Sequence, residues 1–187
     1  MHSSPDPLAV YGLENYLFDH VGPTFRKAGS LSAFDFFIIV IWKSNRAKSK
    51  VAKRLFKHDP HNRKDLTAIV PDLGMAIFQA ADHQARLKLL MVTWGFRLPM
   101  ASAILTVLYP DDFTIYDVRI CWQLGGFGNI PSKKPFSKLW EAYQDFIDAL
   151  RKATPEDLSL RDKDRWLWGK SFVDQLNADI ARGFAKD

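Results

Sequence analysis

The sequence predicts an all-α protein, because helix-period hydrophobic patterns recur along its 187 residues and strand signals are sparse. Polar residues suited to helix N-caps stand directly before several of these patterns, and glycine- or proline-rich breaks separate them. Hydrophobic residues make up 47% of the chain and charged residues 25%, which is enough for a sizeable core. We expect a single helical domain over residues 1–187, with a possible junction between two lobes near 125–136.

In the first half of the chain, each expected helix has a local reason to begin or end. Gly22-Pro23 is expected to end the first one, and Ser32 with Asp35 forms a capping-box-like start for the second. Asp59-Pro60 breaks the third, and Pro71 introduces a joint into the fourth. The expected helices cover residues 8 to about 22, 33 to about 44, a basic segment up to 58, 66–81, and 83 to about 93 after an Asp82 cap.

The second half continues in the same way. Pro99 is tolerated in the first turn of a helix over 98 to about 109, where no intrahelical donor is needed. Asp117 is a plausible N-cap for 118–124. Residues 125–135, with three glycines and two prolines, form the clearest loop. An amphipathic helix over 137–151 follows, and Ser159 with Asp162 caps a last helix to about 182.

Composition excludes several classes of protein. No apolar run reaches the roughly 18 residues of a membrane span, and residues 1–7 lack the apolar core of a signal peptide. The single cysteine, Cys121, excludes an internal disulfide and a cysteine-based zinc site. His58 and His61 lack a third ligand at a familiar spacing. We therefore expect no metal and no cofactor, no membrane partner, and a cytoplasmic location, associated with the nucleoid if the source is bacterial.

Positive charge is concentrated in one segment, residues 43–64. This segment has a net charge of +8, which leaves −3 for the rest of a chain whose total is +5. A strongly basic segment in a chain whose remaining charges nearly cancel is typical of a surface that binds polyanions. A lysine-rich helix that is simply exposed to solvent is an alternative of equal weight. On the helix itself we expect Val51 and Leu55 to face inward. The expected outward residues are Lys50, Lys53, Arg54 and Lys57.

Gly95 lies between two helical patterns, where a turn needs a positive φ that only glycine adopts without strain. The next helix should begin with free backbone N–H groups near Arg97, Leu98 and Met100. These amides and the positive end of the helix dipole favour a phosphate oxygen, and the guanidinium of Arg97 could add a charge-assisted contact. A plain turn between two helices is the alternative.

Three further stretches carry a resemblance to a known family. They are Leu98-Pro99-Met100-Ala101-Ser102-Ala103-Ile104-Leu105, Tyr109-Pro110-Asp111 and Ile115-Tyr116-Asp117-Val118-Arg119. Together they resemble the helix-hairpin-helix DNA glycosylase superfamily, in particular the 8-oxoguanine glycosylase fold and its small bacterial relatives. The similarity is most specific over about 30 residues, 94–124. Looser similarity extends to residues 41–46 and 160–168.

The resemblance implies a two-lobed helical fold with a central hairpin, and it implies that Asp117 is the catalytic aspartate. An ionised carboxylate there would stabilise an oxocarbenium-like sugar and align or deprotonate the attacking water. The family's bifunctional members carry a nucleophilic lysine where this chain has Pro99. A monofunctional glycosylase is therefore expected, unless Lys43 or Lys88 reaches the site. The hairpin also departs from the family's Gly-x-Gly, because Arg97 replaces the second glycine.

Other candidate residues follow from the expected substrate, which is a DNA duplex or, as the alternative, a single strand. Trp42 and Trp94 are candidate walls for a flipped base, with a core role as the alternative. Arg119 could contact a phosphate or pair with Asp112. The expected DNA-binding residues are Gly95, Arg97, Leu98, Met100, Arg119, Lys43, Arg46 and Lys50. A monomer is expected. Two alternatives stay open, namely a non-catalytic DNA-binding module and an all-α interaction protein with a basic face.

Overall fold

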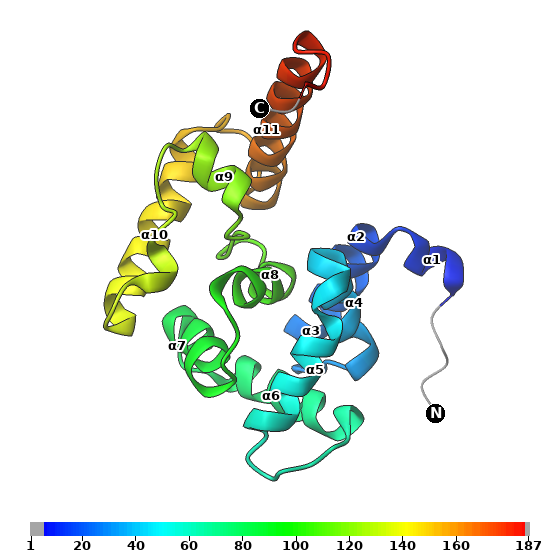
Figure 1. Ribbon diagram of the computed structural model, residues 1–187. Helices are drawn as coiled ribbons and strands as arrows, with labels where there is room; N and C mark the ends of the chain where they lie inside the picture. Colours follow the sequence, from blue (N-terminus) through cyan, green and yellow to red (C-terminus); the bar gives the residue numbers. More distant parts are fainter. Residues whose placement is uncertain (1–5, 186–187) are drawn as a thin grey trace. The chain divides into compact units, whose positions relative to one another are not determined.

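The computed structural model describes residues 6–185, which contain helices and no strand (Figure 1). The predicted all-α class is therefore confirmed. The α-helices are α1 (Pro7–Tyr11), α2 (Leu13–Tyr16), α3 (Gly22–Ala28), α4 (Ala33–Ser44), α5 (Lys48–His58), α6 (Leu66–Gln79), α7 (His83–Lys88), α8 (Leu98–Leu108), α9 (Val118–Gln123), α10 (Phe136–Lys152) and α11 (Leu160–Ala181). Within the same residues, no helix is long and apolar enough to span a bilayer.

The predicted N-caps are present. The Ser32 hydroxyl oxygen accepts a hydrogen bond from the Asp35 N–H at 3.0 Å, and the Asp82 carboxylate accepts one from the Ala85 N–H at 2.7 Å. The Ser159 hydroxyl oxygen likewise accepts from the Asp162 N–H at 3.1 Å. Each bond satisfies one of the amides that the first turn of a helix leaves without a partner.

The expected end of the first helix at Gly22-Pro23 is wrong. The chain passes from α2 through a π-helical turn, Leu17–Val21, directly into α3. Pro23 stands within the first two positions of α3, where its missing N–H has little cost. The helical path ends instead at Gly29, which has a φ of 66°.

The chain divides into two compact units, unit 1 (residues 1–112) and unit 2 (residues 113–187). The division lies before the loop where sequence analysis expected a lobe junction, near 125–136. That loop belongs to unit 2, because the Tyr116 hydroxyl donates to the Phe127 carbonyl oxygen at 2.7 Å and Ile130 is buried. Many glycines and prolines indicate a loop, but they do not show whether the loop packs inside a unit.

The core of unit 1 is built around α8. Its residues from Ala101 to Leu108 are all buried, and the hydroxyls of the two polar ones, Ser102 and Thr106, donate to backbone carbonyl oxygens of the same helix. Helices α3, α4 and α7 pack against it. A Cβ on Gly22 would lie 2.5 Å from the Val107 carbonyl oxygen, so glycine permits the close approach of α3.

Unit 2 contains α9, α10 and α11, and α11 packs against both of the others. Tyr143 on α10 is fully buried and stacks with Phe113 and Phe146. Its hydroxyl donates to the Thr114 carbonyl oxygen at 2.5 Å and accepts from the Thr114 N–H at 3.3 Å. The buried phenol thus fixes the extended segment that leads from the unit boundary to Asp117.

Candidate nucleic-acid interface

The turn between α7 and α8 is closed by backbone hydrogen bonds. A π-helical turn, Leu89–Thr93, follows α7. The Trp94 N–H then donates to the Leu89 carbonyl oxygen at 3.0 Å, and the Phe96 N–H donates to the Leu90 carbonyl oxygen at 2.9 Å. Gly95 has a φ of 67°, as the sequence predicts. This region, residues 94–97, is called the 94–97 turn below.

The basic helix α5 is fastened to the 94–97 turn. The Arg54 guanidinium donates a hydrogen bond to the Gly95 carbonyl oxygen. A Cβ at Gly95 would lie 2.8 Å from His58 Nε2, so the imidazole also lies against the turn. Arg54 was expected to face outward with the lysines, and that expectation is wrong, because this side chain reaches the turn. The contact brings the charge-rich helix beside the start of α8.

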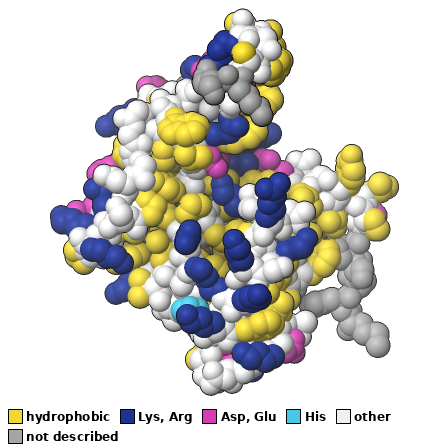
Figure 2. Space-filling view, in the orientation of Figure 1, with side chains coloured by type: hydrophobic (Ala, Val, Ile, Leu, Met, Phe, Trp, Pro, Cys, Tyr) yellow, Lys and Arg dark blue, Asp and Glu magenta, His cyan; other side chains and the backbone are white. Residues whose placement is uncertain are grey.

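The inner face of α5 is Val51 and Leu55, which are buried as predicted. Its outer face and the residues on either side expose their charges to solvent, and Figure 2 shows Lys and Arg side chains gathered over the region of α5. The exposed basic residues of the 43–64 segment are Arg46, Lys48, Lys50, Lys53, Lys57 and Lys64. Lys43 is half-buried near the end of α4.

The acidic residue within this segment does not weaken the surface charge. Asp59 is 3% exposed, and its carboxylate accepts from the Arg63 guanidinium at 2.7 Å. Arg63 also forms an ion pair with Asp72 at 2.7 Å. The hydrogen bonds from Arg63 lower the pKa of Asp59 to about 2. Asp59 and Arg63 therefore stabilise the loop after α5 and leave the exposed lysines as the surface charge.

The N-terminus of α8 offers fewer amides than the sequence suggested. Arg97 is the N-cap, with an exposed side chain and an extended backbone at φ −77° and ψ 152°. The Met100 N–H was expected to be free but donates to the Arg97 carbonyl oxygen at 3.0 Å. Leu98 is buried and Pro99 has no N–H. The amides that precede Met100 at this helix start are those of Arg97 and Leu98, and Leu98 is itself fully buried.

Asp117, in unit 2, is the N-cap of α9. Its half-buried carboxylate accepts a hydrogen bond from the Arg119 N–H at 3.0 Å. The capping alternative weighed from the sequence is therefore present in the structure. A cap and a catalytic carboxylate are compatible, because a capping side chain that is partly exposed still presents negative charge to solvent.

Arg119 is held by α11. Its guanidinium donates to Gln175 Oε1 at 2.6 Å and lies 5.9 Å from the centre of the Trp168 ring. Asp112, the alternative partner suggested by the sequence, lies 3.4 Å from His83 Nε2. The contact with Gln175 could not be predicted from the spacing of residues, because Gln175 lies 56 positions from Arg119 in the sequence.

The two aromatic candidates differ in exposure. Trp94 is 5% exposed and belongs to the core of unit 1, so the core alternative describes it better than a pocket wall. Trp42 is half-buried and packs edge-to-face on Phe18, with ring centres 5.7 Å apart. Lys88, considered as a nucleophile, is exposed at the end of α7.

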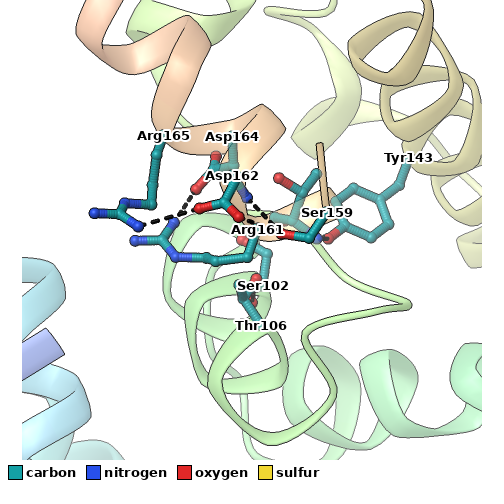
Figure 3. Close-up of polar contacts among 9 residues, drawn as sticks. Ser102, Thr106, Tyr143, Ser159, Arg161, Asp162, Asp164 and Arg165 are labelled. Atoms are coloured by element: carbon teal, nitrogen blue, oxygen red, sulfur yellow. Dashed lines mark hydrogen bonds and ion pairs between the residues drawn. The ribbon is translucent and has the colours of Figure 1, made fainter. Parts of the chain in front are cut away.

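The outlying stretch 160–168 forms the first turns of α11. Figure 3 shows its polar contacts, in which Asp162 contacts Ser159 and Arg165 while Arg161 contacts Asp164. Asp164 is 3% exposed and Arg161 is half-buried, so this pair is largely shielded from solvent.

Within residues 6–185, no group of three His, Cys, Asp or Glu side chains is arranged to hold a metal ion. Burial raises the pKa of the Cys121 thiol, which makes it a poor nucleophile.

Comparison with protein-family models, curated proteins and solved structures gave no match. Any function must therefore be inferred from the geometry above and from the resemblance in the sequence.

Proposed function

We propose that the chain binds double-stranded DNA through the surface formed by the 94–97 turn and α5. The observation that carries this proposal is the hydrogen bond from Arg54 to the Gly95 carbonyl oxygen. This bond links a helix with several exposed cations to the turn that leads into the N-terminus of α8. A phosphate at such a helix start is favoured by the amides and the dipole, and neighbouring phosphates by the lysines.

The proposal extends to the fold and the reaction suggested by the resemblance. The segment α7, 94–97 turn and α8 corresponds to the hairpin of a two-lobed DNA glycosylase, and Asp117 to its catalytic carboxylate. As the bond from the base to the sugar breaks, Asp117 stabilises positive charge on the sugar and orients the attacking water. Pro99 has no amine for a covalent intermediate, so the proposed enzyme is monofunctional and leaves an abasic site.

A non-catalytic DNA-binding module is the second candidate. Two observations favour it, namely the Arg97 side chain in place of a hairpin glycine and the Met100 N–H already bonded to the Arg97 carbonyl oxygen. Both reduce the backbone contacts that a hairpin can make to a phosphate. Such a module would bind duplex DNA through the same cations but release no base.

The role of the Arg54 contact is tested with a pair of variants that remove the same charge. Arg54→Met removes the anchor to the Gly95 carbonyl oxygen, while Lys53→Met removes a neighbouring exposed cation and leaves the anchor intact. We expect Arg54→Met to weaken duplex binding more than Lys53→Met, measured by fluorescence anisotropy at fixed salt. Equal losses of affinity in the two variants would mean that only the positive charge contributes to binding and that the hydrogen bond between α5 and the 94–97 turn does not.

The role of Asp117 is tested with Asp117→Asn and a panel of duplexes that each contain one modified base. Asparagine caps helices about as well as aspartate, so folding and DNA affinity should be retained. We expect the native protein to form abasic sites on at least one duplex and the variant to lose this by about 100-fold or more. Base release that survives the substitution would make Asp117 only a cap. Borohydride trapping of a covalent adduct would contradict the monofunctional mechanism.

A further inference from the structure

His58, the last residue of α5, packs against the 94–97 turn. A Cβ on Gly95 would lie 2.8 Å from Nε2, 3.0 Å from Cε1 and 3.5 Å from Cδ2 of its imidazole, so the Nε2 edge of the ring faces the turn. His58 follows Arg54 by four residues, and side chains at this spacing leave the same face of a helix. Gly95 therefore meets two groups of α5, the guanidinium at its carbonyl oxygen and the imidazole at its Cα.

Both ring nitrogens of His58 are open to solvent. Within residues 6–185, the imidazole forms no hydrogen bond or ion pair, and neither nitrogen is one of the buried polar atoms without a partner. The residue as a whole is half-buried. Packing alone therefore holds the ring beside the turn, and each nitrogen remains free to bond to a ligand.

In the described elements around α5, the carboxylates already have partners. Helix α5 and the 94–97 turn contain no Asp or Glu. The α-helices that pack against α5 are α4 and α6. Asp35 on α4 accepts hydrogen bonds from two hydroxyls, and Asp72 on α6 pairs with Arg63 at 2.7 Å. In the loop after α5, Asp59 also pairs with Arg63, and Asp65 caps α6. These elements therefore offer no negative partner to a protonated imidazole.

The charged side chains beside His58 are cations that continue toward solvent. At about 100° per residue, Arg54 lies between His58 and Lys57 around the axis of α5. Lys57 is exposed, and so is Arg97 in the 94–97 turn. The contact between α5 and the turn therefore combines these cations with a titratable ring and contains no acid. A phosphate supplies the missing negative charge.

Histidine is the side chain whose charge ordinarily changes between about pH 5 and 8. A protonated ring donates a charge-assisted hydrogen bond to a phosphate oxygen, which is about twice as strong as a bond from a neutral donor. We propose that His58 binds a backbone phosphate of the DNA in its protonated form, as a further contact of the surface formed by the 94–97 turn and α5. This inference rests on the proposed function and adds a proton to it.

A proton-linked contact fixes the sign of the pH dependence. Since the protonated ring makes the stronger bond, duplex affinity rises as the pH falls, and binding takes up a proton. The contact also adds one neutralised phosphate at low pH, which steepens the plot of the logarithm of affinity against the logarithm of salt by about 0.9. A histidine that only packs against Gly95 would change neither quantity.

The affinity for a short duplex without modified bases is measured by fluorescence anisotropy at about pH 5.5 and about pH 8, each from about 50 to 200 mM salt. We expect the native chain to bind about fivefold or more tightly at the lower pH. His58→Gln should remove this difference and bind as the native chain does at the higher pH. His61→Gln, at an exposed histidine of the same basic segment, is the matched control and should keep the difference. His58→Lys should bind at the higher pH about as tightly as the native chain does at the lower one, because its charge is permanent.

The outcomes separate this inference from the proposed function. Duplex binding that depends on salt but not on pH would overturn the role of His58 and leave the proposed function intact. A pH dependence that His58→Gln retains would overturn it as well, and one that only His61→Gln removes would assign the proton to His61 instead. If His58→Gln does not fold, as judged by circular dichroism, the native chain still decides, because equal salt slopes at the two pH values would contradict an additional phosphate contact. Absence of duplex binding at every pH would refute the proposed function itself, and this inference with it.

Discussion

Replacing Gly95 by alanine should destabilise unit 1 through two separate effects. The residue has a φ of 67°, and the left-handed conformation costs an L-residue about 1–2 kcal/mol. The new Cβ would also lie 2.8 Å from His58 Nε2. Because His58 is half-buried and can swing outward, we take the lower end of the overpacking range, about 1 kcal/mol. The expected total is about 2–3 kcal/mol.

Two further variants separate these effects. Gly125 has the same φ of 67° but a Cβ there would meet nothing within 4 Å, so Gly125→Ala should cost only about 1–2 kcal/mol. His58→Ala should remove the collision, so the double variant with Gly95→Ala should recover about 1 kcal/mol.

The free energy of unfolding from urea titrations, followed by circular dichroism, measures all of these variants. A Gly95→Ala cost no larger than that of Gly125→Ala would refute the close contact with His58. Additive effects of Gly95→Ala and His58→Ala would refute it as well, because residues in contact are expected to couple.

Three other predictions concern stability. The pKa of Asp59 is lowered to about 2 by Arg63, so the ionised carboxylate stabilises the folded state above the unfolded pKa of about 3.9, and this stabilisation is lost as the pH falls toward 2. In acid titrations, Asp59→Asn should therefore lose less folding stability between pH 4 and 2 than the native chain does. Equal losses in the two proteins would contradict the pairing. Tyr143→Phe leaves the buried Thr114 carbonyl oxygen without its donor and should lower the free energy of unfolding in urea by about 1–3 kcal/mol. An unchanged free energy of unfolding would show that this hydrogen bond does not stabilise the fold. Ser159→Ala should cost about 1 kcal/mol as a lost N-cap, and Ser159→Thr, which keeps the hydroxyl, should restore most of that stability if capping is the reason.

Local features of the fold could be predicted from the sequence because their causes are local. The expected helices are capped by Ser32, Asp82, Asp117 and Ser159. A short polar side chain directly before a helical hydrophobic pattern can accept a hydrogen bond from the first turn, so these N-caps are visible in the sequence itself. Gly95 adopts its positive φ for the same kind of reason, as the residue between two helices.

Features that depend on distant residues could not be predicted in this way. Arg54 stands among outward-facing lysines in the sequence, yet it contacts the Gly95 carbonyl oxygen 41 residues away. Arg119 contacts Gln175 across 56 residues, and Trp94 lies in the core of unit 1. Helical periodicity gives the angle of a side chain about its own helix, but which other element meets that side chain is decided by tertiary packing.

The salt dependence of duplex binding tests the central claim most directly. The affinity is measured from 50 to 200 mM salt for the native chain, for Lys50, Lys53 and Lys57 changed to glutamine, and for a control with Lys134, Lys138 and Lys152 changed instead. We expect the native affinity to fall about 100-fold or more, and the α5 variant to lose about 2–3 units of the logarithmic slope. The control should behave like the native chain. A native affinity that ignores salt, or equal slopes in all three proteins, would contradict DNA binding through α5.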